Sequence, residues 1–223
     1  MRNLALTILL VISFFFTSGQ GKAEYGVFLG TASYNGDINH SKLFYSPSVG
    51  IGLLANYNIS RHLVVGLKGV YGSLNGSDSD FNYPENQIRQ ASFSTSVIDV
   101  SAVVEFNFMS YTSSGFTKKN DERFTPFVFL GIGGNYVFGS TDNSAPLSIP
   151  FGLGFKYNIF ERVTLGLEWS FRKTFNDTID GVITIQDTEN TPSIHNDDWY
   201  SFCGLFVTYR VFKEKIDCPA YIK

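Results

Sequence analysis

The sequence contains few of the residues from which most catalytic and metal sites are built. Its 223 residues include only two Cys and three His, with no G-x-S-x-G motif, no H-x-x-x-H pair and no Cys/His cluster. His40 and His195 lie in polar stretches that we expect to be loops, where a histidine is usually an ordinary polar residue. We therefore predict a non-enzymatic protein with no catalytic residues, no cofactor and no metal.

Long apolar runs and an excess of charge are also missing. After residue 23, no segment reaches the roughly 18 continuous apolar residues that a transmembrane helix requires. The formal net charge of −3 gives no basic footprint for nucleic acid.

Residues 1–23 predict a secretory signal peptide. Arg2 is followed by the apolar stretch 4–16 and by the small-x-small site Gly21-Lys22-Ala23, although cleavage near Gln20 is an alternative. The apolar stretch is too short to anchor the chain across a bilayer core of about 30 Å, and the absence of a nearby cysteine excludes a lipoprotein. An exported chain without a transmembrane helix can cross a membrane only as a closed barrel.

The sequence does contain stretches in which apolar residues alternate with small or polar ones, and residues 147–171 show this pattern most clearly. On either side of a turn at 158–162, apolar side chains alternate with small or polar ones. Because successive side chains of a strand point to opposite faces, this stretch is a hairpin with one apolar and one polar wall. Lys156, Glu168 and Arg172 lie on the polar wall, which is typical of a transmembrane barrel. A soluble sandwich can show the same period.

The pattern recurs along the chain and predicts eight strands. They are residues 25–34, 48–57, 62–73, 92–109, 124–138, 147–159, 163–172 and 199–212. We predict an all-β fold: an eight-stranded antiparallel transmembrane β-barrel of OmpA/OmpX size over residues 24–212, followed by a tail at 213–223. Short turns after the second and sixth strands, with long loops at the other end, predict an outer-membrane protein with periplasmic termini.

Seven charged residues fall on the inward face of the expected strands. They are Lys68, Asp99, Glu105, Lys156, Glu168, Arg172 and Arg210. The interior of an eight-stranded barrel is just wide enough for side chains to fill. We therefore predict a lumenal salt-bridge network that keeps the barrel shut, in preference to an ion path.

Several stretches, taken in order, resemble a known family. They include YGVFLGTASYNGDIN, VIDVSAVVEFNF, RFTPFVFLGIG, IPFGLGFKY and the ending DWYSFCGLFVTYRVFKEKIDCPAY. This series resembles the PorG family, Bacteroidota outer-membrane barrels associated with the type IX secretion system, over essentially the whole mature chain. The resemblance implies a barrel that anchors or docks a periplasmic ring of PorK-like lipoprotein and PorN-like subunits. Outer-membrane lipid is the other expected partner.

The expected periplasmic surface is basic. Its charged residues include Lys118, Lys119, Arg123, Lys213 and Lys215. Basic residues in isolated turns are commonly only solvated. With the ring that the resemblance implies, we expect them to steer its encounter with the barrel.

Cys218 lies in the polar tail and cannot readily pair with Cys203, which is about 30 Å away along the last strand. The residues alone do not decide whether Cys218 forms an intermolecular disulfide or remains a free thiol. The resemblance favours a disulfide from Cys218 to a ring subunit. Two rival functions also stay open: a stability or adhesion barrel acting through its outer loops, and an outer-membrane lipid-modifying enzyme.

Overall fold

The computed structural model describes residues 23–35, 44, 46–77, 92–109, 123–138, 146–160, 162–175 and 199–211. Several predictions concern residues outside these ranges: the signal peptide and the tail, with His40, Lys118, Lys119, His195, Lys213, Lys215 and Cys218.

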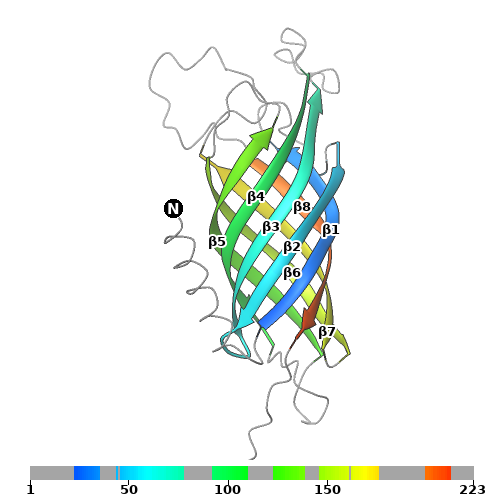
Figure 1. Cartoon of the computed structure of the whole chain (residues 1–223), viewed down its shortest axis with the longest axis vertical. Helices are drawn as coiled ribbons and strands as arrows, with labels where there is room; N and C mark the ends of the chain where they lie inside the picture. The colour runs from blue at the N-terminus through cyan, green and yellow to red at the C-terminus, as the bar shows by residue number, and fades with distance from the viewer. Residues whose placement is uncertain are drawn as a thin grey trace, which may run out of the picture.

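Eight strands form one closed sheet (Figure 1). They are β1 (Ala23–Asn35), β2 (Ser48–Asn58), β3 (Leu63–Ser77), β4 (Ser92–Asn107), β5 (Phe124–Phe138), β6 (Leu147–Phe160), β7 (Val163–Thr174) and β8 (Trp199–Arg210). Each strand pairs antiparallel with its neighbour in sequence, and β1 pairs with β8 to close the barrel. The predicted eight-stranded antiparallel barrel is confirmed.

The strand bounds differ from the predicted ones by a few residues. β1 begins two residues earlier, because Ala23 and Glu24 pair with Tyr57 and Asn56 of β2. β3 extends to Ser77, where it still pairs with Ser92 of β4. A strand therefore continues for as long as a neighbour provides backbone partners, which its own side-chain alternation does not reveal.

The two ends of the barrel differ. We call the end where β1 begins and β8 finishes the terminal end, and the opposite one the loop end (Figure 1). Tight turns join β2 to β3 and β6 to β7 at the terminal end, where Leu63 O accepts hydrogen bonds from the backbone nitrogens of Ile59 and Ser60. In the described ranges, no helix is long and apolar enough to cross a membrane.

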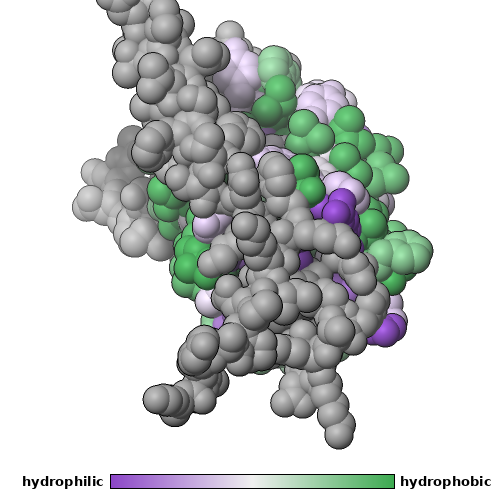
Figure 2. Space-filling model, turned by 60° about the horizontal axis from the view of Figure 1, so that its bottom comes forward, coloured by the Kyte–Doolittle hydropathy of each residue, from purple (hydrophilic) through white to green (hydrophobic). Residues whose placement is uncertain are grey.

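The outer wall is aliphatic at mid-height and aromatic toward each end. The exposed aliphatic side chains include Val27, Leu29, Leu53, Leu67, Val100, Leu130, Ile132, Leu153, Leu167 and Leu205. Tyr25, Tyr57, Phe124, Tyr157 and Tyr209 lie toward the terminal end, and Tyr71, Tyr136 and Phe138 toward the loop end. Hydrophobic side chains form much of the wall that Figure 2 shows. An apolar band between two aromatic girdles is the surface that barrels present to lipid.

Candidate functional site

The candidate site is the lumen, because all four acidic residues of the described ranges point into it. Each of its eight charged residues is at most 4% exposed. They are Glu24, Lys68, Asp99, Glu105, Lys156, Glu168, Arg172 and Arg210. Seven of the eight are the residues that the sequence placed on the inward face, and Glu24 is the addition. Four cations and four anions make the lumen electrically neutral.

Two of the ion pairs join a lysine to a glutamate. Lys68 Nζ on β3 lies 2.5 Å from Glu168 Oε2 on β7. These strands are four apart in an eight-stranded ring, so the pair joins opposite walls. Lys156 on β6 pairs with Glu105 on β4.

Phenylalanine rings cover both ammonium groups. Lys68 Nζ lies 3.6 Å from the centre of the Phe129 ring, and Lys156 Nζ lies 4.7 Å from that of Phe127. The ring face attracts a cation and at the same time excludes water from it. Each lysine is therefore held between a carboxylate and an aromatic ring, which is how a buried ammonium is best tolerated.

Asp99 is the centre of a hydrogen-bonded network toward the loop end. Its carboxylate accepts from Tyr200 Oη at 2.9 Å, Ser101 Oγ at 3.3 Å, and both Arg172 Nε and Ser148 Oγ at 3.4 Å. Asn135 Nδ2 donates to the Tyr200 hydroxyl at 3.1 Å. The network joins five consecutive strands, β4 to β8, across the lumen.

Glu24 and Arg210 pair at the terminal end, where β1 meets β8. The Glu24 carboxylate also accepts from Asn58 Nδ2 at 2.8 Å and Thr208 Oγ1 at 3.2 Å. Sequence reasoning missed Glu24 because it placed the start of the first strand at Tyr25. The signal was present in the charge count, since four inward cations against three anions implied a missing acid.

Aromatic rings fill the space between the ion pairs, and glycines on the neighbouring strands make room for them. Phe206 and Phe127 are buried and meet edge to face, with ring centres 6.1 Å apart. A Cβ atom added at Gly166 would lie 2.1 Å from the Phe206 ring. The inward glycines therefore permit a packed interior at this strand number.

The remaining predicted residues in the described ranges are separate from this network. Arg123 is exposed at the terminal end, and its carbonyl accepts from Asn158 N at 2.8 Å. Cys203 is half-buried on β8, in no disulfide. His62 Nδ1 lies 2.9 Å from Asn107 O. Among the residues that the structure describes, no group of three or more His, Cys, Asp or Glu could hold a metal ion.

Comparison with known proteins identifies the family and the fold. The model of the family described as a domain of unknown function, DUF6089, matches residues 2–220, so the chain belongs to that family. No curated protein matches the chain.

Three solved barrels are similar in structure. Neisserial surface protein A (NspA) aligns with a TM-score of 0.55 and 10% identity, over 86% of this chain and 99% of that one. Ail, the attachment invasion locus protein of Yersinia pestis, aligns with a TM-score of 0.46 and 13% identity, over 85% of this chain and 98% of that one. The outer membrane protein OprG of Pseudomonas aeruginosa aligns with a TM-score of 0.46 and 11% identity, over 86% of this chain and 99% of that one. The likeness to NspA shows a shared barrel fold.

Proposed function

We propose that this DUF6089 chain is a non-enzymatic barrel of the outer membrane that acts as an anchor and not as a channel. The observation that carries the proposal is a lumen closed by four buried ion pairs and packed phenylalanine rings. The apolar outer wall between aromatic girdles supports the membrane location, because lipid is the solvent that such a wall fits.

Passage of an ion through this lumen is unfavourable. The Lys68–Glu168 pair joins opposite walls, so a permeating ion has to separate it. Separating a buried pair leaves two charges without compensation, and removing one partner of such a pair typically costs about 3–5 kcal/mol. A barrel closed in this way presents surfaces at its two ends and carries nothing between them.

The specific role that we propose is docking of the periplasmic ring of a type IX secretion system. The support is the ordered resemblance to the PorG family, together with a closed lumen that suits docking better than transport. The partners would be PorK-like lipoprotein and PorN-like ring subunits at the terminal end, which would face the periplasm.

The charge of the described terminal rim fits this role. Arg61 and Arg123 are exposed there, and Arg162 is half-buried, with Nη1 donating to the Tyr209 hydroxyl at 3.2 Å. The described acids are all in the lumen, so the described rim carries only positive charge. A cationic rim steers a partner with an acidic face.

Affinity purification of the tagged full-length protein from detergent-solubilised outer membranes tests the docking role. Ring subunits should co-purify, and a deletion strain should lose secretion of proteins that carry a C-terminal sorting domain. An intact secretome combined with lost surface adhesion would favour the rival function of an adhesion barrel. In planar bilayers the purified barrel should show no stepwise conductance, and regular open-channel currents would overturn the closed-lumen interpretation.

A further inference from the structure

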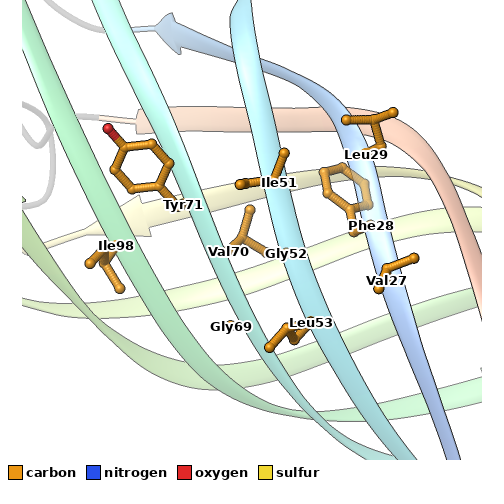
Figure 3. A pocket seen from close by; sticks show the side chains of 10 residues that line it. All are labelled: Val27, Phe28, Leu29, Ile51, Gly52, Leu53, Gly69, Val70, Tyr71 and Ile98. Carbon is orange, nitrogen blue, oxygen red and sulfur yellow. The ribbon is translucent and has the colours of Figure 1, made fainter.

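The outer wall of β1 to β4 contains an apolar groove with a volume of about 580 Å³ (Figure 3). Its lining residues are Val27, Phe28, Leu29, Ile51, Gly52, Leu53, Gly69, Val70, Tyr71 and Ile98. Figure 3 shows aliphatic side chains of β1, β2 and β4 around the groove, with Tyr71 of β3 beside Ile98. None of the eight lumenal charged residues lines the groove, and two lining residues, Phe28 and Val70, are buried residues of the barrel core.

Gly69 is the cause of the hollow. It points outward in the row Val27–Leu53–Gly69–Val100, where each neighbour carries a branched aliphatic side chain. A Cβ atom added at Gly69 would meet nothing within 4 Å, so the space above this residue is open. The backbone of Gly69 is not in the left-handed region, so its conformation does not require glycine. The missing side chain therefore matters for the shape of the surface and not for the chain path.

We propose that this groove binds one acyl chain of a bilayer phospholipid as an ordered ligand. The proposal rests on the membrane placement proposed above. The groove lies at aliphatic mid-height, with Tyr71 of the loop-end girdle at its edge, so it is at the depth of the hydrocarbon. Its one hydroxyl, on Tyr71, already donates to Ser96 Oγ at 3.2 Å. Nothing in the groove therefore selects a polar ligand.

Shape favours an acyl chain over a protein surface. Within lipid there is no hydrophobic driving force between apolar surfaces, so association depends on the number of van der Waals contacts. A flexible chain can follow a concave floor made by the backbone of Gly52 and Gly69, with side chains on both sides. A second copy of this barrel presents short side chains on fixed strands, which cannot extend along the floor as a flexible chain can.

Native mass spectrometry of the full-length barrel gives the first test, using nanodiscs of phosphatidylethanolamine and phosphatidylglycerol followed by transfer to detergent. The wild type should retain one phospholipid, and Gly69→Phe should lower that occupancy by about fivefold because the ring takes the place of packed methylenes. Gly134→Phe is the matched control: Gly134 also points outward and lies outside the groove, and a Cβ atom added there would have one neighbour within 4 Å, the Pro146 carbonyl oxygen at 3.9 Å. Equal retention by wild type and Gly69→Phe, or equal loss in both variants, would overturn the proposal.

A photo-crosslinking residue at Leu53, introduced in cells, identifies the occupant. A phospholipid adduct that Gly69→Phe reduces supports the proposal, and a product with a protein chain, lipoprotein included, overturns it. Leu130→Cys, on the wall away from the groove, reports on the membrane placement itself. Labelling of that cysteine by a water-soluble thiol reagent in intact membranes would refute the placement, whereas protection with no lipid adduct at Leu53 would refute only the groove.

Discussion

Glu24 and Arg210 face each other on the two strands that close the barrel, and their side chains form a buried ion pair. They belong to the first and last strands, 186 residues apart in sequence. The barrel is closed only where these two strands meet, so the ion pair lies on the seam that closes it. Because Asn58 also donates to Glu24, the seam is joined to β2 as well.

Breaking this pair should destabilise the barrel. Glu24→Ala leaves the Arg210 guanidinium buried without its counter-ion, and we expect a loss of about 3–5 kcal/mol in the free energy of unfolding. The double substitution Glu24→Gln with Arg210→Met removes both charges and should remain within about 1 kcal/mol of the wild type. Reversible guanidinium unfolding in lipid vesicles measures both values. Equal stability of Glu24→Ala and wild type would show that the seam does not depend on the pair.

An arginine introduced on the outer wall should lower the free energy of unfolding by an amount that depends on its depth in the membrane. Leu167 and Ile59 are both 46% exposed, but Leu167 lies at mid-height and Ile59 in the β2–β3 turn. Leu167→Arg should cost about 2–4 kcal/mol, and Ile59→Arg about 0–1 kcal/mol, because only the first is held in hydrocarbon. The same unfolding experiment compares them. Similar costs for the two substitutions would contradict a membrane-spanning wall.

The alternating pattern, together with the predicted signal peptide and the lack of a transmembrane helix, was enough to predict the barrel from the sequence. A strand period of two assigns every side chain to lumen or lipid, so the seven inward charges followed directly from the strand registers. Pairing across the lumen could not be predicted in the same way. Lys68 and Glu168 are 100 residues apart and meet only because a ring of eight strands places β3 opposite β7.

The groove at Gly69 could not be predicted from the sequence either. The alternating pattern places Gly69 on the outer face, between Leu67 and Tyr71, but a single glycine there does not predict a groove. Its outward direction follows from the register, but the open space above it depends on how Leu53, Tyr71 and Ile98 are oriented on neighbouring strands. Glu24 was missed for a simpler reason, because the first strand was expected to begin one residue later, at Tyr25.

Replacement by alanine should destabilise the barrel at Gly204 and have little effect on its stability at Gly69. A Cβ atom at Gly204 would lie 2.4 Å from Gly30 Cα and 2.5 Å from Leu29 O, so the backbones of β8 and β1 would have to separate. Gly204→Ala should therefore cost about 1–3 kcal/mol or more. Gly69→Ala meets open space and should stay within about 1 kcal/mol of the wild type. Unfolding midpoints in the same vesicles report both, and equal values would show that the β1–β8 contact relaxes freely.

The basic rim should contribute to ring association mainly through its rate. Replacing Lys118, Lys119 and Arg123 with alanine removes three positive charges from the connection before β5. We expect slower association with the ring at low salt and a weaker dependence on ionic strength, because steering acts on encounter. Surface plasmon resonance between barrel nanodiscs and purified ring measures this. Alanines at Lys213 and Lys215 separate the tail from the loop, and unchanged kinetics in the loop variant would exclude the loop from the interface.

Cys218 should form an intermolecular disulfide. It lies in the tail, outside the described residues. The periplasm, which we propose for this tail, is a compartment where thiols are generally oxidised. Cys203 is an unsuitable partner because it is half-buried on the outer wall of β8, eight residues before Val211, where the described part of the chain ends. The resemblance to a ring-docking family suggests a ring subunit, and we propose the lipoprotein because its lipid anchor would hold it at the same membrane.

Non-reducing electrophoresis of outer membranes, with thiols blocked at lysis, tests the bridge. The wild type should run as a heavier species that reductant collapses to the monomer. Cys218→Ser should abolish that species, whereas the matched control Cys203→Ser should keep it, because Cys203 packs on the wall as a small hydrophobe. A monomeric wild-type band would exclude the bridge. A heavier species that persists in Cys218→Ser but disappears in Cys203→Ser would move the covalent contact to the outer wall, where a ring at the terminal end could not make it.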